Sequence, residues 1–192
     1  MPPKAKITKE NILSVSLNLV RSEGFSSLNA RAIANKLGCS TQPIFRIYAT
    51  MEEAKIDVIA IAREYFYEFF NEHIKRKDVP PYKASGLAYI QFSKDEKELF
   101  KLLFMRDRTD EQTQVSGYDF DTAIKMIMEA TGFNYDIAKK FHLEIYIFIH
   151  GIAAMIVTSY LDISDEVIND LLTDAYQGLL KLYQEQEGCN NL

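Results

Sequence analysis

The sequence has little of what marks several large classes of protein. Its two cysteines, Cys39 and Cys189, lie far apart and show no metal-ligand spacing. Its longest apolar stretch, near residues 145–157, contains His150 and Gly151 and is too short and too mixed to span a bilayer. The first residues lack the apolar core of a signal peptide. We therefore expect a cytoplasmic protein without a metal site and without a membrane segment.

Motifs of catalysis are missing as well. The three histidines, His73, His142 and His150, are scattered, and no nucleophile motif, glycine-rich phosphate loop or framed pair of carboxylates is present. The sequence thus predicts no catalytic residue, no metal ligand and no cofactor. His150 is expected to be a buried, hydrogen-bonded histidine, and contact with a polar ligand is the alternative.

The charge of the chain is unevenly distributed. Hydrophobic residues make up 47% and charged residues 26% of the 192 residues, which is typical of a soluble globular protein, and the net charge is −5. Residues 1–50 hold seven basic and two acidic residues, a net charge of +5, whereas the other 142 residues hold 15 and 25, a net charge of −10. A DNA phosphate backbone would attract the first segment and repel the second. This asymmetry suggests two functions.

The periodicity of apolar residues is helical throughout, and no strand-like alternation stands out. N-cap residues, glycines and the Pro80–Pro81 pair divide the chain into about nine helices. The sequence therefore predicts an all-α fold. The expected helices run from Thr8 to Gly24, from Asn29 to Leu37, from Ser40 to Tyr48 and from Thr50 to a point before Pro80, and then over residues 82–93, 95–105, 119–131, 134–161 and 164–186.

Residues 30–49 have the pattern of a helix-turn-helix. Two short helices that cross steeply need a small residue where they approach, which is Ala34, and a turn residue that tolerates positive φ, which is Gly38. Five apolar side chains are spaced to form the buried side of the pair, namely Ile33, Leu37, Cys39, Ile44 and Ile47. A helical hairpin inside a larger core, without nucleic acid, is the alternative.

The second helix of such a pair enters the major groove with its N-terminal residues toward the bases. Here these residues are Thr41, Gln42 and Pro43, and glutamine can form two hydrogen bonds with adenine. We expect Ser40 to cap this helix by reaching Gln42, because Pro43 removes one backbone donor. Arg46 would contact a phosphate or a guanine. Two lysines, Lys4 and Lys6, would form a basic arm that neutralises phosphate or enters the minor groove.

The first fifty-odd residues resemble the TetR (tetracycline repressor-like) family. The resemblance lies in Gly24-Phe25, Arg31-Ala-Ile-Ala34, Leu37-Gly-Cys-Ser40, Ile44-Phe-Arg-Ile-Tyr48 and Glu52-Glu53. It implies a cytoplasmic bacterial homodimer that binds palindromic double-stranded DNA and releases it when a small-molecule effector binds. It also implies a helix-turn-helix domain over residues 1–50, joined by a long fourth helix to a ligand-binding and dimerisation domain over residues 51–192.

The resemblance places the aromatic residues Phe45 and Tyr48 near the phosphate backbone. Phe45 replaces the more usual tyrosine, and Met51 stands where a lysine is common, whereas Thr50 at a helix N-terminus can still bind phosphate. The predicted DNA-binding residues are Lys4, Lys6, Asn29, Arg31, Ser40, Thr41, Gln42, Pro43, Phe45, Arg46, Tyr48 and Thr50.

The last two long helices are apolar enough to pack on several sides, which favours a seam with a second copy of the chain. The predicted interface residues are Gly151, Ala154, Met155, Leu171, Leu172, Ala175 and Leu179. Monomer core is the alternative for both helices.

Many bulky side chains between the connector and these helices are typical of an apolar ligand pocket. The predicted pocket residues are Phe66, Phe69, Phe70, Tyr89, Phe92, Phe104, Met105, Met126, Phe141, Tyr146 and His150. Core packing is the alternative for each of them. For the whole chain, the sequence favours a DNA-binding transcriptional regulator, a repressor released by a small, largely apolar ligand. The alternative is a helical enzyme or interaction protein without DNA binding.

Overall fold

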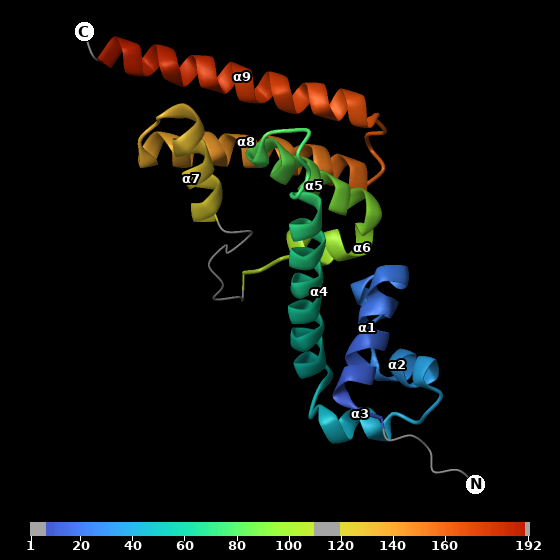
Figure 1. Ribbon diagram of the computed structural model, residues 1–192. Helices are drawn as coiled ribbons and strands as arrows, with labels where there is room; N and C mark the ends of the chain where they lie inside the picture. The colour runs from blue at the N-terminus through green and yellow to red at the C-terminus, as the bar shows by residue number, and fades with distance from the viewer. Residues whose placement is uncertain (1–6, 110–119, 191–192) are drawn as a thin grey trace. The chain divides into compact units, whose positions relative to one another are not determined.

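The computed structural model describes residues 7–109 and 120–190 of the chain. Every regular element in these residues is helical and no strand occurs among them, so the predicted all-α fold is confirmed (Figure 1). The nine α-helices of the described residues are α1 (Lys9–Glu23), α2 (Ala30–Leu37), α3 (Gln42–Ile47), α4 (Met51–His73), α5 (Pro81–Asp95), α6 (Lys97–Phe100), α7 (Phe120–Thr131), α8 (Tyr135–Val157) and α9 (Asp165–Asn190).

Most helices begin at the polar residue that the sequence predicts. The Thr8 hydroxyl accepts the Asn11 amide at 3.3 Å, and the Asn29 side chain accepts the Ala32 amide at 3.0 Å. Asn134 caps α8, and Ser164 accepts the Val167 amide at the start of α9. Because each cap satisfies an amide that the first helical turn leaves free, these boundaries follow from the local sequence.

Two local predictions are wrong. Ser40 does not cap α3: the residue at the N-cap is Thr41, and no side-chain hydrogen bond caps this helix. Thr41 already has helical backbone angles, φ −73° and ψ −13°, whereas a capping residue usually has an extended backbone. The helix predicted for residues 95–105 is split into α6 and a π-helical turn, η2 (Lys101–Met105). It starts later than expected because the backbone of Glu96 is not helical.

The chain forms two compact units. Unit one comprises residues 1–68 and 96–107, and unit two comprises residues 69–95 and 108–192, so that α4 contributes to both. In unit one, α1 packs on α2, on α6 and on the short 3-10 turn η1 (Phe25–Ser27). The fully buried side chains of unit one include Ile12, Leu19, Ile33, Ile44, Val58, Leu99 and Phe100. The functional division predicted at residue 50 stays a prediction.

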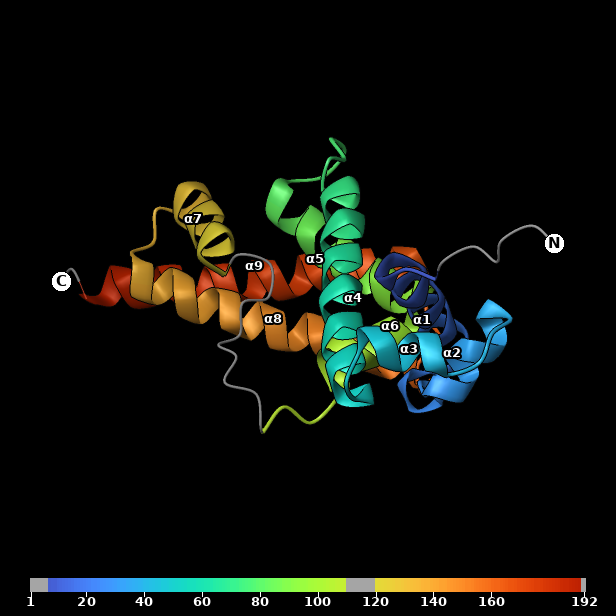
Figure 2. The ribbon, with the colours of Figure 1, turned by 90° about the horizontal axis from the view of Figure 1, so that it is seen from below.

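Unit two is built around α8, which packs against α5, α7 and α9. Figures 1 and 2 show α8 and α9 side by side along most of their length. Gly86 allows α5 to approach α8 closely, because a Cβ at this position would lie 2.8 Å from Cδ1 of Ile149. The fully buried side chains of the unit include Phe92, Ile124, Ile127, Phe141 and Ile168.

Among the described helices, only α8 is long and apolar enough to cross a bilayer, judged by length and composition alone. A helix of a protein core passes the same test. One side of α8 is covered by α5 and α7, and only 33% of its apolar window is buried within the chain. The cytoplasmic location stays a prediction.

Candidate nucleic-acid interface

The turn between α2 and α3 has the geometry that the helix-turn-helix pattern requires. Gly38 ends α2 in the left-handed conformation, φ 64° and ψ 36°, which costs glycine little and other residues more. The Cys39 amide then donates to the carbonyl of Ala34 at 3.0 Å, closing the turn. Ala34 itself is buried, as expected of a small residue at a helix crossing. The two helices are thereby held in a fixed geometry.

The buried side of the pair largely matches the predicted positions. Ile33 and Ile44 are fully buried, and Leu37 and Cys39 are half-buried. The prediction for Ile47 is wrong, because its side chain is 37% exposed. It is the last residue of a helix of only six, and the following residue, Tyr48, has an extended backbone and takes the buried position instead.

One face of α3 is open to solvent. Gln42, Phe45 and Arg46 are exposed, whereas Thr41 and Pro43 are half-buried. In Figure 1, α3 lies at the lower edge of unit one, and Figure 2, seen from below, shows no other described helix of this unit in front of it. The face therefore presents an amide, a guanidinium and an aromatic ring, which are groups that contact base edges and phosphates in the major groove.

Two arginines of this region have no acidic partner among the described residues. Arg31 on α2 and Arg46 on α3 are both exposed, and no ion pair joins either one to a described side chain. Lys36, by contrast, lies 3.4 Å from the exposed carboxylate of Glu23, a pairing that adds little stability. The two arginines are thus free to pair with phosphate.

Two of the predicted DNA-binding side chains have structural roles, although only one of them, Tyr48, is buried. Asn29 accepts the first amides of α2 and donates to the Ser27 carbonyl at 2.9 Å. Tyr48 is only 4% exposed, and its hydroxyl donates to Asp57 at 2.9 Å. Burial, and next the bond to Asp57, raise the pKa of Tyr48. This placement does not favour a phosphate contact through the Tyr48 hydroxyl.

The remaining predicted contacts divide by their surroundings. Ser40 and Thr50 are exposed, and the Thr50 hydroxyl accepts the Glu53 amide at 3.3 Å, so that its own proton is available to a phosphate. The Glu53 carboxylate in turn accepts the Ala49 amide at 2.9 Å. The predicted arm, Lys4 and Lys6, lies outside the described residues.

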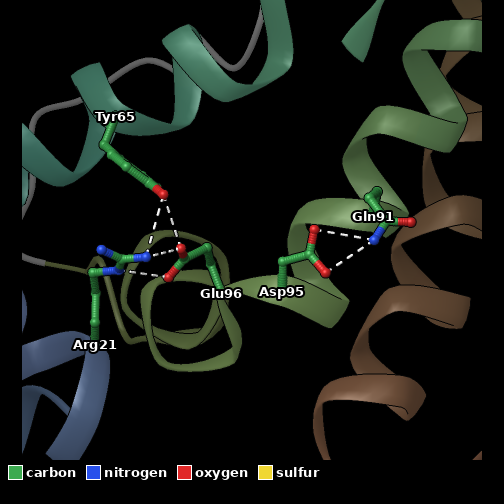
Figure 3. Close-up of polar contacts among 5 residues, drawn as sticks. All are labelled: Arg21, Tyr65, Gln91, Asp95 and Glu96. Atoms are coloured by element: carbon green, nitrogen blue, oxygen red, sulfur yellow. Dashed lines mark hydrogen bonds and ion pairs between the residues drawn. The ribbon is translucent and has the colours of Figure 1, made fainter. Parts of the chain in front are cut away.

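A half-buried ion pair joins α1 to the residue that precedes α6, and the sequence did not predict it. Glu96, 8% exposed, accepts two hydrogen bonds from the Arg21 guanidinium, one of them from Nε at 2.8 Å (Figure 3). The Tyr65 hydroxyl donates to the same carboxylate at 2.9 Å. The hydrogen bond with Glu96 raises the pKa of Arg21. We call these three residues the clamp. Glu96 lies in the polar run Lys94–Lys97, at the start of the helix predicted for residues 95–105, and nothing in this run marks one carboxylate as buried.

The predicted pocket residues do not gather around one cavity. Phe66, Phe104 and Met105 belong to unit one and the other eight to unit two. Five are buried core side chains, namely Phe66, Phe70, Tyr89, Phe92 and Phe141. The others are half-buried, namely Phe69, Phe104, Met126, Tyr146 and His150, except for Met105, which is 41% exposed. Of all eleven, only Met126 lines the largely apolar cavity that unit two contains.

That cavity has a volume of about 590 Å³ and lies among α5, α7, α8 and α9. The sequence did not predict the lining of this cavity, because Pro80 and Pro81 were interpreted only as the residues that end a helix. Nearby, two tyrosines of α5 pair with histidines of α8: Tyr82 with His142 and Tyr89 with His150, each at 2.9 Å. Burial lowers the pKa of His142 to about 4, so the ring is neutral at neutral pH. His150 is thus hydrogen-bonded, as expected, and half-buried.

Apolar side chains form an exposed stripe on α8. Leu143, Ile147 and Met155 follow one another at helical spacing and are 46%, 61% and 36% exposed, and Phe148 beside them is 37% exposed. Leu182 on α9 is 45% exposed. The predicted residues Gly151, Ala154, Leu171, Ala175 and Leu179 are half-buried, and Met155 lies in the stripe. Leu172 does not face outward as predicted: it is 6% exposed and lines the cavity of unit two.

Comparisons with known proteins establish the fold alone. No family model matches the chain, and no curated protein matches it. Among solved structures, a protein from Rhodococcus sp. RHA1, described as having unknown function, is similar with a TM-score of 0.68 and 16% identity, over 94% of this chain and 98% of that one. The likeness therefore extends over nearly the whole helical arrangement, although the two sequences have diverged far.

Proposed function

We propose that the chain is a sequence-specific DNA-binding transcriptional regulator with the organisation of the TetR family. In this proposal it is a repressor that a small, largely apolar ligand releases from its operator. The observation that supports it most is the open face of α3, where Gln42 and Arg46 are exposed on a helix held by a turn of the required geometry. This helix lies in residues 1–50, whose net charge is +5, whereas the other 142 residues carry a net charge of −10.

In this proposal, some of the exposed residues contact bases and others contact phosphates. Gln42 reads a base through its amide, which is able to donate to and accept from adenine at once. Arg46, one turn later, anchors a phosphate or reads guanine, and Arg31 anchors a phosphate from the neighbouring helix. Thr50 adds its hydroxyl proton at the start of α4. Tyr48 at the end of α3 and Asn29 at the start of α2 have structural roles in this proposal, since their polar atoms are already hydrogen-bonded.

The apolar stripe on α8 supports a homodimer. Exposed leucine, isoleucine, phenylalanine and methionine at helical spacing form a patch that water disfavours, and a second copy of the same face covers it symmetrically. Two copies bring two α3 helices to one palindromic operator, whose half-sites lie about 34–36 Å apart when they are one turn apart. An effector then acts only through different affinities for the DNA-bound and DNA-free arrangements of the dimer.

Selection from a random duplex library, followed by titration at about 50 and 200 mM salt, tests the proposal. We expect one palindromic sequence to be enriched and its affinity to fall steeply with salt, by about 0.9 in logarithmic slope for each phosphate neutralised. Gln42→Ala should relax the preference at one base position of each half-site, at about 1–3 kcal/mol of discrimination. Arg46→Ala should weaken binding to all sequences and lower the salt slope by about one if it contacts phosphate.

Lys97→Ala is the matched control, since Lys97 is an exposed cation of α6, at the end of unit one away from α3 (Figure 1). It removes the same charge and should leave both affinity and salt slope in place. A library from which no sequence is enriched would overturn the proposal and favour a helical enzyme or interaction protein. Equal losses for Arg46→Ala and Lys97→Ala would show that binding depends on charge alone and not on α3.

A further inference from the structure

The cavity of unit two has the size and lining of a small-molecule site. Its volume of about 590 Å³ lies within the range of roughly 300–1,000 Å³ that is usual for such sites. Apolar side chains from three helices form its inner part, namely Met126, Ile145, Ile149 and Leu172. Ile145 and Leu172 are almost fully buried, so a ligand reaching them would leave water. Such a lining favours a ligand with an apolar body.

A single cation stands among the residues that line this cavity. Lys83, in the first turn of α5, is half-buried, and its ammonium group donates to the Thr173 hydroxyl at 2.6 Å. No described acidic side chain forms an ion pair with it. One hydrogen bond to a neutral hydroxyl leaves two of the three ammonium donors available. The positive end of the α5 dipole lies at the same place and adds to the attraction for an anion.

Two other polar groups of the lining, the Tyr82 hydroxyl and the Glu129 carboxylate, are less suited to select a ligand. The Tyr82 hydroxyl is already hydrogen-bonded to His142 at 2.9 Å. The one acidic side chain of the lining, Glu129 on α7, is exposed, so its charge is well solvated. A half-buried ammonium held by a neighbour attracts the carboxylate of a ligand strongly, whereas water weakens the attraction between an exposed carboxylate and the ammonium of a ligand. The chemistry of the wall thus favours an acid over an amine.

We propose that this cavity binds an amphipathic monocarboxylic acid, with its carboxylate on Lys83 and its hydrocarbon body against Ile145 and Leu172. The acid is the effector if the chain is the regulator proposed above, and only that part of the inference rests on the proposed function. Binding itself needs no DNA. A negative result in the DNA experiment therefore leaves this site standing, and a negative result here leaves DNA binding standing.

Isothermal titration calorimetry of the full chain with three ten-carbon probes tests the site directly. Decanoate, decanol and decylamine share one chain length and differ only in the charge of the head group. We expect decanoate to bind about tenfold more tightly than decanol, and decylamine more weakly than either, as follows from one charge-assisted hydrogen bond. Equal affinity for all three, tightest binding of the amine, or no binding of any probe would each overturn the proposal.

Variants then locate the two ends of the ligand. Lys83→Met should bring decanoate down to the affinity of decanol, and Lys83→Glu should shift the preference to decylamine. Lys125→Met, which removes an exposed cation of α7 that does not line the cavity, is the matched control and should change nothing. Leu172→Phe, which extends into the cavity, should weaken all three probes alike. Retention of the acid preference by Lys83→Met would refute the assignment even if Leu172→Phe fails to fold.

Discussion

Replacing Arg21 by methionine should destabilise unit one by more than the same replacement of Arg76 destabilises unit two, because the carboxylate partner of Arg21 is buried and that of Arg76 is exposed. The Arg21 guanidinium makes two hydrogen bonds with Glu96 and lies with Cζ 5.0 Å from the centre of the Tyr65 ring. Methionine keeps most of the apolar stem but leaves the Glu96 carboxylate, 8% exposed, with the Tyr65 hydroxyl as its remaining side-chain donor in the clamp. A buried charge without its partner is the main cost of such a change.

The magnitude follows from the burial of the two partners. Removing one member of a fully buried ion pair costs about 3–5 kcal/mol. The Arg21 side chain is 38% exposed, however, so water can partly solvate the carboxylate, and about 2–3 kcal/mol is the expected loss. Glu96→Gln should cost a similar amount. The double variant should lose less than the sum of the two, by about 1.5 kcal/mol, because it removes both charges together.

An exposed pair of the same geometry is the control. Arg76 also donates to a carboxylate through two nitrogens, with Nε 2.8 Å and Nη2 2.5 Å from the Asp78 oxygens, but the Asp78 side chain is 60% exposed whereas that of Glu96 is 8% exposed. Arg76→Met should therefore cost less than about 0.5 kcal/mol. Because the two arginines are almost equally exposed, the comparison of Arg21→Met with Arg76→Met separates the effect of carboxylate burial from that of bidentate geometry.

Circular dichroism at 222 nm follows the unfolding, since the chain contains no tryptophan. For a chain of this size, 2–3 kcal/mol corresponds to a fall in melting temperature of roughly 4–12 °C. Because two units can unfold separately, hydrogen exchange of peptides from α1 and α6 should assign the loss to unit one. Equal losses for Arg21→Met and Arg76→Met would refute the reasoning, since burial would then have no effect.

Three further predictions concern a turn, a histidine and the α8 stripe. Gly38→Ala should destabilise unit one by about 1 kcal/mol in a thermal melt, and Gly38→Asn by less, because φ is 64° and nothing within 4 Å would meet a Cβ, so that a larger loss would contradict a purely backbone cost. Burial lowers the pKa of His142 from 6.5 to about 4, so between these pH values the unfolded chain binds more protons than the folded chain, and stability should decrease as the pH is lowered. The difference in unfolding free energy between the parent chain and His142→Phe should therefore shrink by about 1 kcal/mol from pH 7.5 to pH 5, after a discount for solvent screening. A difference that stays constant would show that His142 does not cause the pH dependence. If the proposed homodimer forms through α8, Ile147→Asp should yield a monomer in light scattering, whereas replacing Tyr160, 83% exposed beyond the end of α8, by aspartate should leave the dimer mass unchanged. An unchanged mass for both variants would argue against the α8 interface.

The sequence alone determined where the helices lie and where the helix-turn-helix is. A capping residue such as Asn29, or a left-handed glycine such as Gly38, interacts with backbone groups no more than three or four residues away. The helix ends that such residues set can therefore be predicted from the local sequence. The turn between α2 and α3 and the burial of Ile33 and Ile44 were predictable for the same reason. The open face of α3 then followed from the positions that those residues do not occupy.

The tertiary structure decided which side of each helix is buried. The sequence of an apolar helix such as α8 or α9 does not show which side faces the core. The predicted interface therefore included Leu172, which is buried, and omitted Ile147, which is exposed. Glu96 was unpredictable for a related reason, because its partner Arg21 lies 75 residues away in the sequence. Burial and pairing depend on contacts between distant segments, whereas caps and turns depend on neighbours along the chain.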